Sequence, residues 1–187
     1  MSDTQSLTNH FLIAMPSLQD PNFQRTVTFI CEHNENGALG IVINRPSEVT
    51  LGDLLHHMDL SVTDTGTAEQ PVYMGGPVQR ERGFVLHPAS ERWETSLQVS
   101  GEIAVSTSRD VLAAIAEGNG PAHYLVALGY AGWGGGQLEE EMAQNAWLSG
   151  PADPGIIFET ANEERWQAAA SLLGVDLRLL SSDAGHA

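Results

Sequence analysis

Residues 26–44 read TVTFICEHNENGALGIVIN, and this stretch carries the clearest fold signal in the chain. Apolar and polar residues alternate from Thr26 to His33, which predicts a strand. The side chains expected on one face are Val27, Phe29, Cys31 and His33. Asn34-Glu-Asn-Gly37 is a turn signal and 39–44 predicts a second strand, so residues 26–44 predict a β-hairpin.

Further strand signals surround this hairpin, at 10–15, 72–74, 83–87, 97–99, 103–106, 123–128 and 155–158. Helix signals are fewer. Capping boxes at 50–53 and 107–110 predict two helices, the second closed by Gly118, and two more are expected to open at 136 and 160. The glycine-rich segment 129–136 predicts a tight turn, 61–70 a flexible stretch and 181–187 a frayed tail.

Strands outnumber helices, and most connections are too short for repeated crossover helices. We therefore predict an α+β fold with a mixed, largely antiparallel sheet. Length and continuity predict one domain over 1–187, with its ordered core at about 7–180.

The charge of the chain excludes several chemistries. Among 187 residues there are 24 acids and 8 arginines, with no lysine, for a net charge of −16. The missing lysine rules out a phosphate-loop lysine, a Schiff base and a pyridoxal anchor. The negative charge argues against direct nucleic-acid binding. No signal peptide and no membrane-length apolar run is seen, so we expect a cytoplasmic protein without a membrane partner.

Metal and cofactor motifs are missing from the sequence. The single cysteine and the histidine spacing do not fit a zinc site, so we predict no metal and no cofactor. The segment Gly129–Gly136 fails the dinucleotide fingerprint at Gln137 and lacks the lysine of a phosphate loop.

Cys31 and His33 form one candidate for chemistry. A thiol near an imidazole can act as a nucleophile or redox sensor. The alternative is that Cys31 is simply packed in the core beside Phe29, since free cysteines are often buried.

The order and spacing of several motifs resemble the bacterial YqgE/AlgH family. These motifs are NHFLIAMP (9–16), DPNF (20–23), RTV (25–27), CEH (31–33), GALGIVINRP (37–46), GGPV (75–78), RGFVLH (82–87), ALGYAGW (127–133), GQLE (136–139) and NAWL (145–148). Arg45 stands where family members often have lysine. The resemblance implies an α+β fold with a barrel-like curved sheet and flanking helices, and a cytoplasmic role in regulating alginate synthesis. It also makes Arg25, Cys31, Glu32, His33, Asn44, Gly75, Gly76, His87, Tyr130, Trp133, Gln137, Glu139 and Asn145 family-pattern positions.

The favoured hypothesis is a non-enzymatic regulatory or binding protein that acts through a small ligand or a protein partner, with any effect on transcription indirect. Its pocket is expected between segments 75–87 and 129–147. The candidate ligand-binding residues are Arg25, Asn44, Gly75, Gly76, Tyr130, Trp133, Gln137 and Asn145.

Two alternatives stay open. One is a thiol-based sensor or enzyme, with Cys31, His33, His87 and Glu139 as the candidate catalytic residues. Convergence of these four side chains on one solvent-reached site would favour it. The other is an interaction protein whose acidic surface mimics an anionic partner.

Overall fold

The computed structural model describes residues 6–180, and within them ten strands form one mixed sheet. The strands are β1 (His10–Ala14), β2 (Val27–Asn34), β3 (Gly37–Val42), β4 (Pro46–Thr50), β5 (Pro71–Met74), β6 (Val78–Pro88), β7 (Ser96–Gln98), β8 (Ile103–Ser106), β9 (Leu125–Gly134) and β10 (Trp147–Pro151). The main order is β10-β1-β2-β3-β9-β6-β8-β7, and β5 adds to β9 with β4 beside it.

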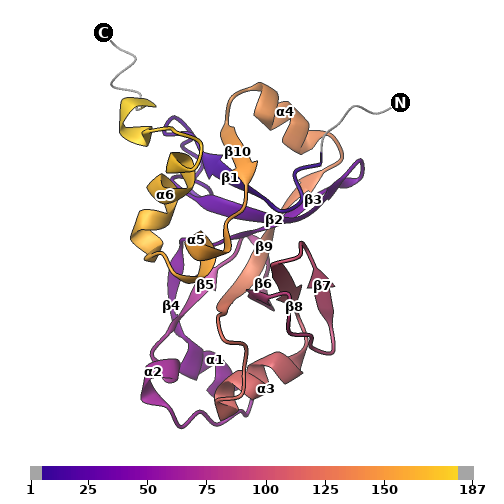
Figure 1. Cartoon of the computed structure of the whole chain (residues 1–187), viewed down its shortest axis with the longest axis vertical. Helices are drawn as coiled ribbons and strands as arrows, with labels where there is room; N and C mark the ends of the chain where they lie inside the picture. The colour runs from indigo at the N-terminus through magenta and orange to yellow at the C-terminus, as the bar shows by residue number, and fades with distance from the viewer. Residues whose placement is uncertain (1–5, 181–187) are drawn as a thin grey trace.

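Short helices cover the sheet. They are α1 (Leu51–His57), α2 (Thr65–Ala68), α3 (Arg109–Glu117), α4 (Gln137–Ala143), α5 (Pro154–Phe158) and α6 (Arg165–Ser171), with 3₁₀ turns at η1 (Asn162–Glu164) and η2 (Leu177–Leu180). Figure 1 shows α1, α2 and α3 at one end of the molecule, with α4 and α6 at the other.

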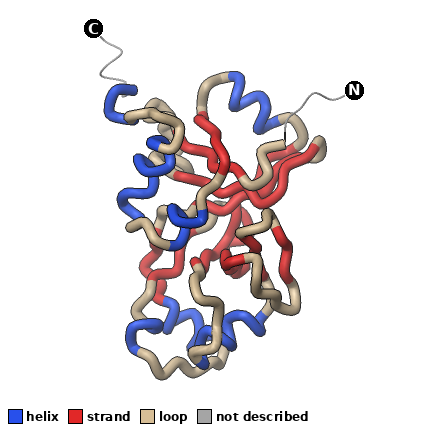
Figure 2. The backbone as a smooth tube through the Cα atoms, viewed as in Figure 1, coloured by secondary structure: helices blue, strands red, loops and turns tan. Residues whose placement is uncertain are grey.

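Strand β9 links the two ends of the fold. It pairs with β3 through its last residues and with β5 and β6 through its first. Figure 2 shows the strands running through the middle of the molecule, with helices outside them. The β5–β9 ladder is the one parallel pairing among the described residues, because the other recorded pairs are all antiparallel. The predicted α+β fold with a mixed, largely antiparallel sheet is confirmed.

Three apolar clusters hold the helices on the sheet. The largest joins strands β1, β2, β3, β5, β6, β8 and β9 to α5 and α6, with Phe29 and Ile157 fully buried. A second packs α1 and α3 on β5, β6 and β9. The third packs Leu138 of α4 against Trp133 and Trp147. Burying these faces is what fixes the position of each short helix, since helices of this length are marginal alone.

Several local predictions are confirmed. The hairpin 26–44 forms as β2 and β3, and the Thr50–Asp53 capping box opens α1. Helix α3 ends at Gly118, whose φ of 83° is favourable for glycine.

Other local predictions are wrong. Residues 155–158 form helix α5 rather than a strand, because Asp153 caps it and Pro154 occupies its first turn. The stretch 61–70 contains α2, capped by Asp64. The segment 129–136 continues as strand through Gly134, since β3 pairs with it. Helix α3 has no side-chain cap bond, so the second capping box does not form. The predicted tail at 181–187 lies outside the described residues.

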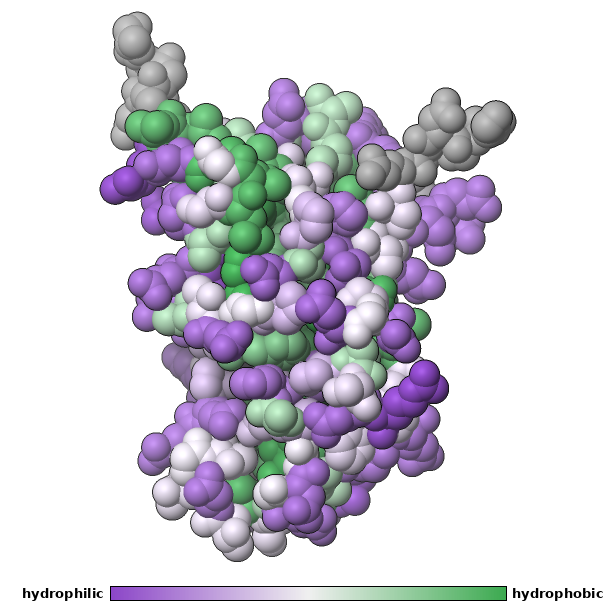
Figure 3. Space-filling model, viewed as in Figure 1, coloured by the Kyte–Doolittle hydropathy of each residue, from purple (hydrophilic) through white to green (hydrophobic). Residues whose placement is uncertain are grey.

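Figure 3 shows hydrophilic residues over most of one face, with apolar residues gathered where α6 lies. Exposed leucines follow α6 directly, at Leu172 and Leu173, and end η2, at Leu179 and Leu180. Within residues 6–180, the structure has no helix with the length and apolar character needed to span a membrane.

Candidate functional site

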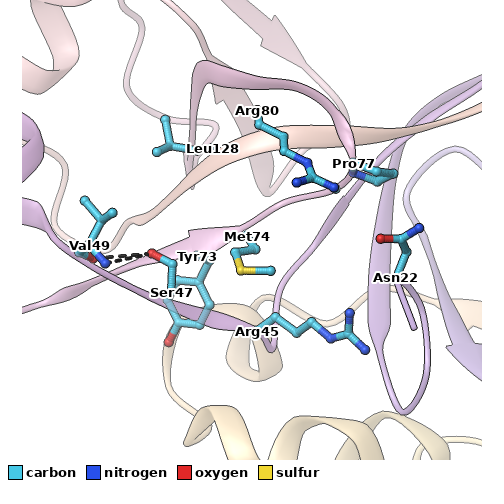
Figure 4. A pocket seen from close by; sticks show the side chains of 10 residues that line it. Asn22, Arg45, Ser47, Val49, Tyr73, Met74, Pro77, Arg80 and Leu128 are labelled. Atoms are coloured by element: carbon cyan, nitrogen blue, oxygen red, sulfur yellow. Dashed lines mark hydrogen bonds between the residues drawn. The ribbon is translucent and has the colours of Figure 1, made fainter. Parts of the chain in front are cut away.

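A pocket of about 260 Å³ lies between β4, β5 and the start of β6. Its lining residues are Asn22, Arg45, Ser47, Val49, Tyr73, Met74, Gly76, Pro77, Arg80 and Leu128. Figure 4 shows the Arg80 and Arg45 side chains on opposite sides of Met74, with Tyr73 beside Met74. We call this the Arg45–Arg80 pocket. None of the lining residues within 6–180 is a carboxylate, although the chain carries 24 acids.

Arg45 is held by the chain segment that precedes β2. Its Nη1 donates to the Pro21 carbonyl at 2.6 Å, and its Nη2 donates to the Gln24 carbonyl at 2.9 Å. Partial burial lowers the pKa of Arg45, and the nearby charge of Asp20 opposes that shift. The guanidinium stays charged at neutral pH and has further N–H donors beyond the two it uses here.

Tyr73 lines the pocket, and its ring also contacts a buried cation. The guanidinium carbon of Arg165 lies 5.2 Å from the centre of the Tyr73 ring, and Arg165 is only 6% exposed. Arg165 donates to the carbonyls of Ile156 and Ile43. No carboxylate within residues 6–180 makes a salt bridge with it. Two carbonyl dipoles and the face of the Tyr73 ring therefore compensate the positive charge of Arg165.

The rim of the pocket combines charge with exposed apolar surface. Arg80 is exposed, and its side chain makes no hydrogen bond or ion pair with any residue within 6–180. Met74 is 49% exposed and Val49 is 37% exposed. Arg80 is thus available to the anionic group of a ligand, and the apolar rim is available to the apolar part of the same ligand.

The candidate catalytic residues do not converge. Cys31 is 2% exposed and belongs to the largest apolar cluster. Burial, followed by the charge of Glu32, raises the pKa of the Cys31 thiol. A sensor or nucleophile needs the opposite, an exposed thiol of lowered pKa.

The predicted common face for Cys31 and His33 is wrong. The β2–β3 register pairs Ile30 with Gly40 and then Glu32 with Leu39, so Cys31 is the extra residue of a β-bulge. A bulge puts two consecutive side chains on one side and reverses the alternation after them. His33 is therefore carried to the other face, toward α4.

His33 meets Glu139 on that face. The Leu7 N–H donates to His33 Nδ1 at 2.8 Å, so Nε2 carries the hydrogen and donates to Glu139 Oε2 at 3.2 Å. His87 lies apart from them, fully buried. Its Nδ1 donates to the Pro88 carbonyl and its Nε2 accepts from the Ser106 hydroxyl at 2.7 Å. Both ring nitrogens of each histidine thus have hydrogen-bond partners, and the two side chains tie separate segments together.

The comparisons with known proteins identify the family. The profile described as AlgH-like (DUF179) matches residues 11–178. The chain belongs to the AlgH-like family. A UPF0301 protein of Thioalkalivibrio sulfidiphilus is 58% identical over 187 residues, 100% of each chain. One of Nitrosococcus oceani is 57% identical over 179 residues, 96% of each.

Two solved structures are similar to this member of the family. The solution structure of the AlgH protein from Pseudomonas aeruginosa is 52% identical, with a TM-score of 0.80 over 100% of this chain and 99% of that one. A crystal structure from Corynebacterium diphtheriae is 22% identical, with a TM-score of 0.75 over 97% of this chain and 95% of that one, which shows the fold alone. None of these names states an activity, so function must be argued from the site.

Half of the candidate ligand-binding residues lie around the loop before β2 and the loop after β5. Gly76 lines the Arg45–Arg80 pocket. A Cβ on Gly76 would stand 2.1 Å from the Tyr130 carbonyl carbon, and one on Gly75 would stand 2.3 Å from the Gly129 oxygen. Asn44 bridges the Val27 N–H and the Arg25 carbonyl, while Arg25 itself lies over the Trp166 ring.

The other half lie along β9 and α4. Tyr130 and Trp133 line an open groove of about 450 Å³ that also includes Glu32 and Val78. Gln137 accepts from the Gly134 N–H and donates to Glu141. Asn145 adopts a positive φ of 61° in the turn before β10. The expected grouping of 75–87 with 129–147 therefore describes this groove better than the Arg45–Arg80 pocket.

Sequence reasoning missed Arg45, Tyr73 and Arg80 as site residues. The available signal was the scarcity of cations, since two of only eight arginines line one pocket. Within residues 6–180, no three histidine, cysteine or carboxylate side chains are grouped so as to hold a metal ion.

Proposed function

We propose that this protein is a non-enzymatic binding protein that takes a small organic anion in the Arg45–Arg80 pocket and acts as a regulator through that ligand. The observation that carries the proposal is the charge of the lining. In a chain of net charge −16, two of the described residues that line this pocket are arginines and none of them is an acid. Such a local reversal of charge favours an anion and disfavours a cation.

The shape and lining of the pocket define the rest of the ligand. A volume of about 260 Å³ lies just below the range of drug-sized sites and suits a single ring or a short chain. Tyr73, Met74 and Leu128 offer apolar contact in the same pocket as the two cations. A carboxylate or phosphate attached to one small apolar group fits both features.

Phenyl phosphate is a direct probe of this site. Isothermal titration, with amide chemical shifts to locate the contact, should show binding that weakens as salt increases. Inorganic phosphate lacks the apolar part and benzyl alcohol lacks the charge, so each should bind more weakly.

A matched pair of variants separates site binding from general charge attraction. Arg80→Leu should weaken phenyl phosphate binding roughly tenfold, as expected for a lost charge-assisted hydrogen bond. Arg92→Leu removes the same charge from a residue that does not line the pocket and should bind as the wild type does. Equal affinities for the two variants, or no binding to the wild type, would contradict the proposal.

The regulatory part of the proposal is indirect control by a cytoplasmic protein. The charge of −16 opposes contact with DNA, whose affinity depends on cations that neutralise phosphates. A fluorescence titration with duplex DNA at low salt should therefore show no tight complex. Tight binding there would overturn this part of the proposal.

A further inference from the structure

We infer that the loop 20–25 couples the Arg45–Arg80 pocket to an aromatic cluster on the far side of β1 and β2, so that a ligand in the pocket tightens that cluster. This inference rests on the proposed function for its ligand, but the coupling itself is a property of the free protein. The cluster consists of Phe23, Trp133 and Trp147.

One side of the loop faces the pocket. Asn22 lines the pocket, and Arg45 binds the carbonyls of Pro21 and Gln24 on either side of it. These are the two hydrogen bonds that join Arg45 to the loop. Figure 4 shows Asn22 and Arg45 at the same end of the pocket. An anion held by Arg45, Arg80 and Asn22 would keep the Arg45 side chain in the position that binds the loop.

The other side of the loop carries the aromatic cluster. Phe23 stacks on Trp133 with ring centres 5.9 Å apart and meets Trp147 edge-on at 5.5 Å. Both indole N–H groups donate to Glu141 Oε1, at 3.1 and 3.0 Å. Any shift of the loop therefore moves Phe23 against two rings that Glu141 of α4 holds in place.

Adjacent residues of one short loop thus serve two sites. Asn22 and Phe23 are consecutive, so ordering one restricts the other. Coupling of this kind is reciprocal. If the ligand stabilises the loop conformation in which Phe23 packs on the two tryptophans, that packing raises the affinity for the ligand by the same factor. Phe23 should then support ligand binding without lining the pocket, and Arg45 should support the cluster without touching it.

The first test needs no ligand. The ring current of Phe23 acts on the indole N–H resonances of Trp133 and Trp147, and Phe23→Leu gives their positions without that ring. Arg45→Leu should move both resonances toward those positions, while Arg80→Leu, which removes a pocket cation that does not bind the loop, should leave them in place. Arg45→Lys keeps the positive charge but loses the planar guanidinium that binds both loop carbonyls. It should therefore shift the two indole resonances only part of the way. If Arg45→Leu and Arg45→Lys both match the wild type, the coupling is wrong.

The second test uses phenyl phosphate. Phe23→Leu should weaken its binding at least about fivefold, the lower end of typical coupling between sites. Trp93→Phe, a change of aromatic side chain outside the cluster, should leave the affinity unaltered. An unchanged affinity in Phe23→Leu would overturn the coupling and leave the proposed ligand site intact. Failure of the wild type to bind phenyl phosphate would instead count against the proposed function, and the ligand-free test would still decide the coupling.

Discussion

Cys31 and His33 lie two positions apart on β2, yet their side chains point to opposite faces of the sheet. The cause is the β-bulge between Ile30 and Glu32, which leaves Cys31 as the extra residue against β3. Cys31 enters the core beside Phe29, whereas His33 reaches Glu139 on α4. The bulge thus separates the two groups that a thiol–imidazole mechanism would need together.

Burial of Cys31 predicts a specific pH dependence of stability. Its pKa is raised above the ordinary 9.0 in the folded protein, so the folded state keeps its proton where the unfolded state loses it. Stability is therefore intact below pH 9 and falls as the pH rises above it, by up to about 1.4 kcal/mol per pH unit.

Urea unfolding of the wild type and Cys31→Ala at pH 8 and pH 10 measures this effect. The variant should lose less stability across that interval than the wild type. In parallel, a thiol reagent should label native Cys31 only as fast as the protein opens. Rapid labelling of the native state would contradict the buried position.

The His33 contacts predict one tautomer and a stability role. Because Nδ1 accepts from Leu7 N–H, the ring hydrogen sits on Nε2, which ¹⁵N chemical shifts of the imidazole report directly. His33→Phe removes both bonds and should destabilise the protein by about 1–3 kcal/mol, since the Leu7 donor loses its partner. Glu139→Gln can still accept and should cost less. A hydrogen found on Nδ1 would refute the assignment.

A substitution at Gly76 tests whether the close packing of this loop against the Tyr130 backbone stabilises the protein. A Cβ at Gly76 would meet the Tyr130 backbone at 2.1 Å, so Gly76→Ala should destabilise by about 1–3 kcal/mol through a forced backbone shift. Gly83→Ala is the matched control, because nothing lies within 4 Å of its added carbon. It should stay within about 0.5 kcal/mol of the wild type in chemical denaturation. Equal effects of the two changes would argue against the close approach.

Glu141 predicts a graded response in the aromatic cluster. Glu141→Leu leaves the Trp133 and Trp147 N–H groups without their acceptor. It should lower the free energy of unfolding by about 1–3 kcal/mol for each buried donor. Glu141→Gln keeps one side-chain oxygen and should lose less. Thermal unfolding ranks the variants, and the two indole N–H resonances should move together in both. Independent movement of one resonance would show that the carboxylate oxygen is not shared.

Local sequence patterns were enough for the elements with strong local signals. The alternation at 26–33 with the turn at 34–37 predicted the hairpin, and the Thr50–Asp53 spacing predicted the start of α1. Patterns failed where distant partners decide. Residues 155–158 look like a strand because they are apolar, but the Asp153 cap and packing on the core make them helical. Glycines at 129–134 look like a turn, but pairing with β3 makes them strand.

The sequence by itself determined the family, the α+β class and the scarcity of cations, because motif order, short connections and composition do not depend on how the chain is folded. Only the tertiary structure decided where the few arginines lie. Arg45 follows β3 and Arg80 lies near the start of β6, and both line one pocket because β5 pairs with β9 beside them. The bulge at Cys31 is likewise invisible in the alternating pattern, since a bulge is a property of the pairing between two strands.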